Sequence, residues 1–120
     1  MFLLDEACRP IAQAFETPYL VGTACTHREY RDVDVRLMLD DETYDRLVEI
    51  GGYVPTFLGL AIGEYLASRT GLPIDFQIQR LSQANELHHG PRNPLGVRKL
   101  ANYAGDGGII PAPRTELELP

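Results

Sequence analysis

The amino-acid sequence predicts a single α+β domain, of the α/β type, in which a small mixed β-sheet is flanked by helices. Segments that alternate like β-strands are interleaved with segments whose apolar residues recur at the three- and four-residue steps of helices. A length of 120 residues is typical of one domain, and a charged fraction of 23% is ordinary for globular proteins. We therefore expect one domain over residues 1–120, with a core over about 1–80 and a turn-rich extension over about 81–120.

The first predicted helix covers residues 3–15, where apolar side chains recur at helical spacing. Pro10 must lie in its first turn or kink it, because proline lacks the amide hydrogen that a helix interior needs. The apolar run over residues 18–24 enters through a proline and predicts a short buried strand. The alternating residues 32–39 predict the second strand.

Two helices and a third strand are predicted next. Residues 40–52 begin with acidic residues suited to helix capping and end in two glycines. A second helix over about 55–70 has Pro55 in its first turn, Gly71 at its end and two glycines four residues apart, which indicate close packing on a neighbour. Residues 72–80 predict the third strand, in which Ile74, Phe76 and Ile78 alternate with polar residues.

The last third of the chain is dense in Gly, Pro and Asn. Such composition predicts turns and extended chain, apart from a short helix near residues 97–103. The final ten residues are expected to form a mobile tail or an arm on a partner.

Charge and composition exclude several classes of protein. The formal net charge of −6 argues against a protein that coats nucleic acid, and no run approaches the roughly 18 apolar residues of a membrane helix. The first ten residues lack the basic flank of a secretory signal. Cys8 and Cys25 have no metal-ligand spacing and suit a reducing compartment, so we expect a soluble, cytoplasmic protein.

Three aspartates are the candidate functional residues. Because strand side chains alternate, Asp32 and Asp34 share the face opposite the core valines, about 6 to 7 Å apart. Asp75 is turned outward on the third strand by the same rule, and converges with them if the two strands are neighbours. Gln77 and Gln79 share its face and are expected to line any pocket there.

Carboxylates held close repel one another unless a cation or a proton intervenes. Magnesium, which takes one or two protein carboxylates and fills its shell with water and phosphate oxygens, suits this set, and manganese is the alternative. The turn at Gly22 and Thr23 offers backbone amides and a hydroxyl for a phosphate. The simpler interpretation, that the aspartates form the solvated face of an edge strand, stays open.

The combination of these motifs resembles the nucleotidyltransferase superfamily related to DNA polymerase beta, particularly its minimal members. That family has a hydrophobic residue followed by Gly-Ser, then Asp-hydrophobic-Asp after a loop, and a third carboxylate on a later strand. The segments IDFQIQ and GPRNPLG also resemble bacteriophage nucleotidyltransferase-like proteins, which implies a phage-encoded protein in the host cytoplasm. The matching positions are Val21, Gly22 and Thr23, then Asp32, Val33 and Asp34, and finally Asp75.

The resemblance implies a nucleotidyltransferase-like fold and catalysis by two metal ions. Asp32 and Asp34 would bind the metal that carries a nucleoside triphosphate, Asp75 would help to activate the acceptor hydroxyl, and Gly22 and Thr23 would contact the triphosphate. Arg28 and Arg36 lie near this site and are predicted to bind the nucleotide, because guanidinium groups suit phosphate oxygens. For Arg36 a salt bridge to Asp34 is an equal alternative.

The sequence therefore predicts a metal-dependent enzyme that moves a nucleoside monophosphate from a triphosphate to a hydroxyl group. The acceptor, whether small molecule, protein or RNA, and the oligomeric state stay open. The alternative is an inactive binding module of the same fold, antitoxin-like or host-factor-binding, because the chain is short and its turn-rich tail suits wrapping a partner.

Overall fold

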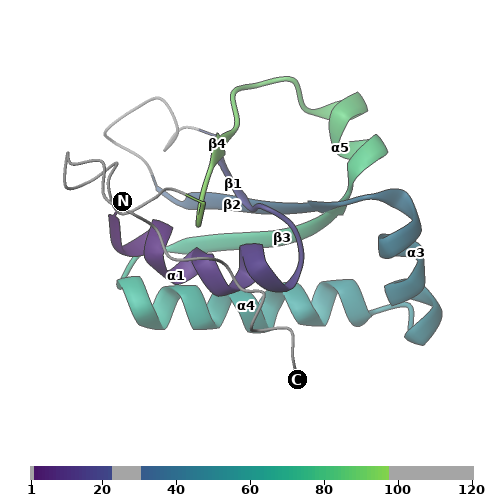
Figure 1. The fold of residues 1–120 in the computed structure, drawn as a ribbon, viewed down its shortest axis with the longest axis horizontal. Helices are drawn as coiled ribbons and strands as arrows, with labels where there is room; N and C mark the ends of the chain where they lie inside the picture. Colours follow the sequence, from purple (N-terminus) through teal and green to yellow (C-terminus); the bar gives the residue numbers. More distant parts are fainter. Residues whose placement is uncertain (1, 23–30, 98–120) are drawn as a thin grey trace.

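The computed structural model describes residues 2–22 and 31–97, in which helices pack on a mixed β-sheet (Figure 1). The elements in chain order are α1 (Phe2–Ala14), β1 (Tyr19–Val21), β2 (Val33–Leu39), α3 (Asp41–Ile50), α4 (Val54–Thr70), β3 (Ile74–Arg80), α5 (Leu81–Leu87) and β4 (Asn93–Pro94). The sheet order is β3-β2-β1-β4. Strands β2 and β3 are parallel, whereas β1 is antiparallel to β2 and to β4. The predicted α+β class with a small mixed sheet is confirmed.

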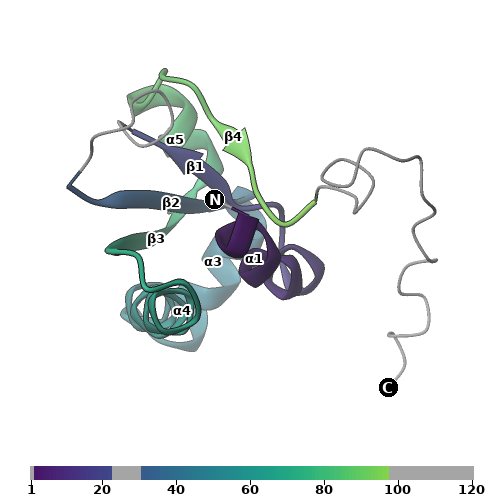
Figure 2. The ribbon, with the colours of Figure 1, turned by 90° about the vertical axis from the view of Figure 1, so that its left-hand side faces the viewer.

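The hydrophobic core lies between the sheet and helices α1 and α4, which cover one of its faces (Figures 1 and 2). Alternate residues of β2 supply its centre, and α1, α4 and β3 contribute the rest. This arrangement follows from strand geometry, because every second side chain of β2 points to the same side. The fully buried residues of β2 are Val33, Val35, Leu37 and Leu39.

Helix α4 packs closely on β3 through a glycine. The backbone of β3 lies so near Gly59 that an added Cβ would come within 3.6 Å of the Phe76 carbonyl oxygen. A Cβ at Gly63 would likewise meet the Cβ of Phe76 at 3.4 Å, so both glycines lie against β3 and the close packing predicted from them is confirmed. The helix ends as predicted, with Gly71 in the left-handed conformation at φ 73°.

The chain after β4 is fastened to α1 by a buried carboxylate. Asp5 is only 2% exposed, and its Oδ1 accepts the backbone N–H of Gly96 at 2.8 Å. Burial, with a smaller effect of Asp5, raises the pKa of the neighbouring Cys8 thiol to about 12. Cys8 is therefore a buried, protonated thiol, whereas Cys25 lies outside the described residues.

Several element boundaries differ from the sequence predictions. Helix α1 begins at Phe2, so Pro10 lies in its interior and not in its first turn. Asp32 precedes β2, which begins at Val33. Strand β1 ends at Val21, whereas the predicted strand continues to residue 24. Residues 23 and 24 lie outside the described ranges.

The turn-rich extension over 81–120 is corrected in its first part. Residues 81–87 form α5, and residues 93–94 form β4, which extends the sheet beside β1. Asp41 of α3 helps to start α5, because its carboxylate accepts the N–H of Ser82 at 3.1 Å. Neither element is evident in the sequence, because both are short and depend on partners distant along the chain. The predicted helix near 97–103 falls almost entirely outside the described residues.

In residues 2–22 and 31–97, no helix combines the length and apolar character needed to cross a membrane.

Candidate functional site

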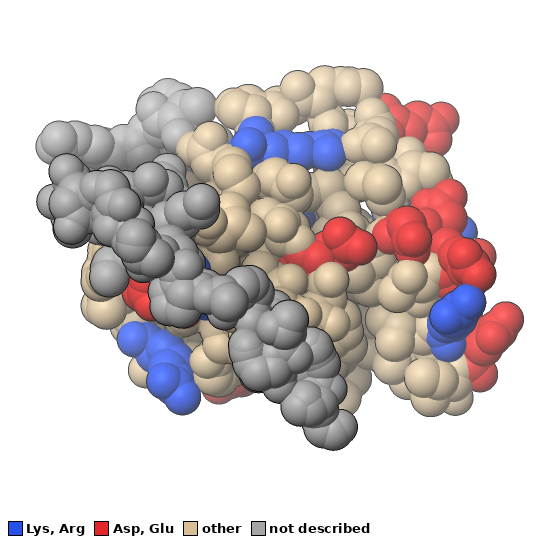
Figure 3. Space-filling model, in the orientation of Figure 1, with Lys and Arg blue, Asp and Glu red and all other residues tan. Residues whose placement is uncertain are grey.

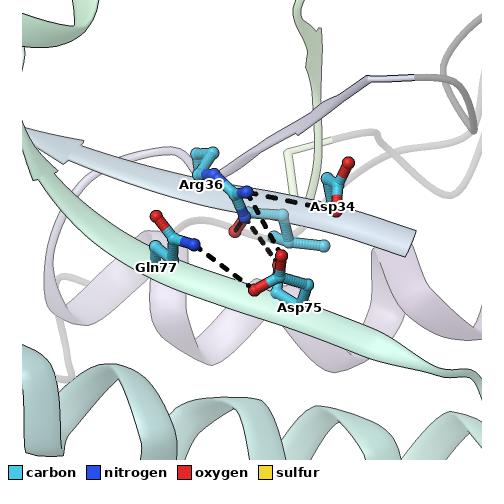
Figure 4. A network of polar contacts seen from close by, with 5 residues as sticks. Asp34, Arg36, Asp75 and Gln77 are labelled. Carbon is cyan, nitrogen blue, oxygen red and sulfur yellow. Dashed lines mark hydrogen bonds and ion pairs between the residues drawn. The ribbon is translucent and has the colours of Figure 1, made fainter. Parts of the chain in front are cut away.

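Asp34 and Asp75 lie opposite each other on neighbouring strands. The parallel pairing of β2 and β3 puts these two residues in register. Both side chains are on the face opposite the core, because Val33 and Val35 flank Asp34 on the buried side of β2. The predicted convergence of these two aspartates is thus present in the fold (Figure 4).

Arg36 follows Asp34 on the same face and binds both carboxylates. Its Nη2 lies 3.4 Å from Oδ2 of Asp75 and 4.0 Å from Oδ1 of Asp34. Its Nη1 donates to the backbone carbonyl of Asp75 at 2.7 Å and to that of Val35 at 3.1 Å. The Arg36 side chain is only 14% exposed. The guanidinium therefore lies low on the sheet as an internal counter-ion, which is the salt-bridge alternative for this residue.

The electrostatic surroundings disfavour the charge on Asp34. Partial burial raises the pKa of its carboxyl group above the ordinary value. Asp75, through charge and a shared hydrogen bond, and Asp32 raise this pKa further, whereas Arg36 acts in the opposite direction. One guanidinium thus compensates the neighbouring carboxylates only in part, and an additional cation would stabilise the ionised form of Asp34.

Gly22 at the end of β1 packs directly against Asp34. Its neighbour Val21 pairs with Asp34 across the antiparallel strands. A Cβ on Gly22 would lie 2.5 Å from Oδ2 of Asp34, and the residue has φ +75°. Only glycine fits here without moving the carboxylate or straining the backbone. The structure therefore brings together four of the predicted site residues, namely Gly22, Asp34, Arg36 and Asp75.

An open cleft of about 590 Å³ is lined by Gly22, Asp34 and Arg36, whereas Asp75 is not part of its lining. Its floor is the polar face of β2 and β3, and its roof is the segment from Leu87 to Arg92 between α5 and β4. Figure 3 shows the hollow beneath this segment, at the top of the molecule. Its volume falls in the range of roughly 300 to 1,000 Å³ that small-molecule sites occupy.

Arg92 holds the roof of the cleft in place. Its Nη1 donates to Oδ1 of Asn85 at 2.8 Å, and its Nη2 donates to the carbonyls of His88 at 3.0 Å and Ala84 at 3.2 Å. These bonds satisfy the C-terminal end of α5, where helix carbonyls otherwise lack partners. The Arg92 guanidinium therefore has a structural role, because it ties the roof segment to the end of α5.

The remaining predicted site residues are placed differently. Asp32 precedes β2 and is exposed, so it is near the cleft without being part of its lining. Thr23 and Arg28 lie outside the described residues. Their predicted contacts with a triphosphate stay predictions.

The predicted metal ion needs side chains that can act as its ligands. In residues 2–22 and 31–97, no group of three or more His, Cys, Asp or Glu side chains is placed to hold a metal. The two facing carboxylates of Asp34 and Asp75 nevertheless fit magnesium or manganese, hard cations that need few protein oxygens when phosphate and water complete the shell. The fold places these two carboxylates on neighbouring strands with Arg36 beside both, and a metal site there stays a prediction.

Other cleft residues lie beyond the carboxylates. Gln77 and Gln79 line the cleft as predicted, and Nε2 of Gln77 donates to Oδ1 of Asp75 at 3.5 Å (Figure 4). His88 and His89 in the roof were not predicted to be near the site. A pattern within β2 or β3 cannot reveal them, because only the return of the chain through α5 and β4 brings them over the sheet.

The chain was compared with known proteins. Neither the protein-family models, nor the curated proteins, nor the solved structures contain a match to it.

Proposed function

We propose that this protein is a metal-dependent nucleotidyltransferase that moves a nucleoside monophosphate from a nucleoside triphosphate to a hydroxyl group. The observation that carries the proposal is Asp34, which lines a cleft of about 590 Å³ with Gly22 packed on it and with Asp75 in register on the neighbouring strand. A triphosphate with its metal fits this pair because nucleotidyl transfer needs mainly positioning and charge neutralisation.

The proposed reaction forms one bond to phosphorus and breaks another. The acceptor oxygen forms a bond to the α-phosphorus, the bond from that phosphorus to the oxygen bridging to the β-phosphate breaks, and pyrophosphate leaves. Asp75 accepts the hydroxyl proton, the role that the family resemblance implies. Asp34 and Asp75 would hold magnesium or manganese, which when bound supplies neutralisation of the phosphate charge.

Three residues of the cleft have a part in this proposal. Asp34 provides a carboxylate whose pKa is raised by burial and by neighbouring acids, so a bound cation would stabilise its ionised form. Gly22 lets the backbone lie directly against that carboxylate, and a phosphate bound at this small-residue turn would lie beside Asp34. Arg36 fixes Asp75 through its backbone carbonyl and side chain.

Calorimetric titration with each of the four ribonucleoside triphosphates, with magnesium or manganese present, tests the proposal. We expect at least one triphosphate to bind, and Asp34→Asn or Asp75→Asn to weaken binding at least tenfold. Glu49→Gln is the matched control, because Glu49 is an exposed acid on α3 outside the cleft. If no triphosphate binds with either metal, the proposal is wrong.

The alternative of an inactive binding module has one observation in its favour. Arg36 already lies between the two carboxylates, where it supplies part of the charge that a metal would otherwise bring. If Arg36 replaces the metal, the wild-type protein binds no manganese and Arg36→Gln gains such binding, measured by manganese paramagnetic resonance. If Arg36 only supports Asp75, the wild type binds manganese and Arg36→Gln weakens that binding.

A further inference from the structure

The outer side of helix α4 is apolar and has no covering element among the described residues. Figure 2 shows α4 end-on, with the sheet above it and α1 beside it, and its outer side away from both. Phe57 is 71% exposed and Leu60 is 64% exposed on this side. Ile50 at the end of α3 is 75% exposed, and Tyr53 in the connecting turn is 84% exposed. We call these four residues the α4 face.

The α4 face is large enough for a stable interface. With about 200 Å² for a large side chain when fully exposed, the four residues expose on the order of 600 Å². A typical stable interface buries about 800 Å² on each partner, of which roughly two thirds is apolar in homodimers. The apolar area of this face therefore matches what one side of a homodimer needs.

Opposite charges bracket the α4 face. Arg46 lies one helical turn before Ile50 on α3, and Glu64 lies one turn after Leu60 on α4. Both side chains are exposed, and Arg46 forms a surface pair with Glu42 at 2.8 Å. In a two-fold arrangement whose axis is perpendicular to α4, the two helices are antiparallel and each end of one copy meets the opposite end of the other. Arg46 then faces Glu64 of the second copy, and Glu64 faces its Arg46.

We propose that the α4 face is the interface of a two-fold homodimer, in which the apolar residues of two copies pack together and Arg46 pairs with Glu64 across the axis. This interface lies on the side of the molecule away from the cleft, because the sheet separates α4 from the roof segment (Figure 1). Dimer formation is thus independent of the proposed nucleotidyl transfer.

Analytical ultracentrifugation of the full chain tests the proposal. We expect a species of twice the chain mass of 13.4 kDa at micromolar concentration. Leu60→Asp should weaken association at least a hundredfold, whereas Leu3→Asp should leave it unchanged. Leu3 is the matched control because it is 60% exposed, close to the exposure of Leu60, and lies on α1. Circular dichroism melting of both variants verifies that each one folds.

Charge exchange tests the orientation of the two copies. Arg46→Glu or Glu64→Arg alone should weaken the dimer several-fold, and the two substitutions together should restore most of the affinity. If the wild-type chain stays monomeric at every concentration up to 100-fold above micromolar, the proposal is overturned. A dimer that Leu60→Asp leaves intact also overturns it. If the full-length double variant Ile109→Asp/Ile110→Asp dimerises while the wild type does not, the C-terminal segment occupies the face instead.

Discussion

The two faces of the sheet use the same strands for opposite purposes. On the covered face, Val33, Val35, Leu37 and Leu39 of β2 are completely buried under α1 and α4. On the other face, Asp34 and Arg36 alternate with them and border an open cleft. Both sets of side chains belong to one seven-residue strand. The two faces therefore differ because helices cover one of them and an open cleft borders the other.

The comparison shows how a fold tolerates carboxylates that repel each other. Burial and neighbouring acids raise the pKa of Asp34, so its ionised form opposes folding at neutral pH. The covered face supplies the stability that holds β2 and β3 in register despite this repulsion. Substitutions on the two faces should accordingly have effects of different size and even of different sign.

The largest expected effect comes from the covered face. Leu37→Ala removes a side chain with no exposed surface and should lower the free energy of unfolding by about 2 to 5 kcal/mol. Urea denaturation followed by circular dichroism measures the change. Leu3→Ala is the control, because this exposed residue should change the free energy by less than about 0.5 kcal/mol. Similar losses in both variants would mean that β2 is not the centre of the core.

The next effect concerns the contact between β1 and the open face. Gly22→Ala should lower the free energy of unfolding by about 1 to 2 kcal/mol, because a non-glycine residue is strained at φ +75°. The new methyl group should also displace the carboxylate of Asp34, which changes its titration in nuclear magnetic resonance spectra.

Gly71→Ala is the control that separates backbone strain from displacement of the Asp34 carboxylate. Gly71 has nearly the same φ of +73°, but nothing within 4 Å of an added Cβ. We expect a similar loss of stability and no change in the titration of Asp34. If both variants alter that titration, the contact between Gly22 and Asp34 is not its cause.

A smaller effect is expected in the roof of the cleft. Arg92→Met keeps the length of the side chain but removes its hydrogen bonds to Ala84, Asn85 and His88. The local stability of α5 should fall by about 1 kcal/mol, measured by hydrogen exchange of its backbone amides. Arg46→Met is the control, because its exposed pair with Glu42 is worth only about 0.3 to 0.5 kcal/mol. Unchanged exchange in α5 would contradict the structural role of Arg92.

The smallest effect has the opposite sign. In metal-free buffer, Asp34→Asn should raise the melting temperature slightly at neutral pH, since it removes a carboxylate whose charge is disfavoured. Because folding raises this pKa, the stabilising contribution of wild-type Asp34 is complete at low pH and is lost as pH rises through its folded pKa. The advantage of the variant should therefore grow with pH, as melting curves across a pH series will show.

Asp40 provides the opposite case for that pH series. Its carboxylate accepts the N–H of Thr43 at 2.9 Å as the N-cap of α3, and this bond lowers the pKa of Asp40. Asp40→Ala should therefore reduce the melting temperature at neutral pH, and the loss should shrink as pH falls through the lowered pKa. Equal pH dependence in the two variants would contradict the assigned environments.

The sequence by itself determined the local features of this protein. Alternation along β2 and β3 separated Asp34 and Asp75 from the core residues, because successive strand side chains point to opposite faces whatever the partner strand is. Helices α3 and α4 were likewise evident from their caps, including Asp40 and Gly71. Pro10 was harder to place, because the packing of α1 on the core outweighs the one helix bond that proline removes.

Only the tertiary structure decided which residues of different elements lie against each other. The parallel register of Asp34 with Asp75, the packing of Gly22 on Asp34 and the binding of Arg36 to the carbonyl of Asp75 all join residues distant in sequence. The short elements α5 and β4 are stabilised by such partners as well, and their propensity alone is weak. Strand periodicity is a property of the local backbone, whereas pairing depends on how the whole chain closes around one core.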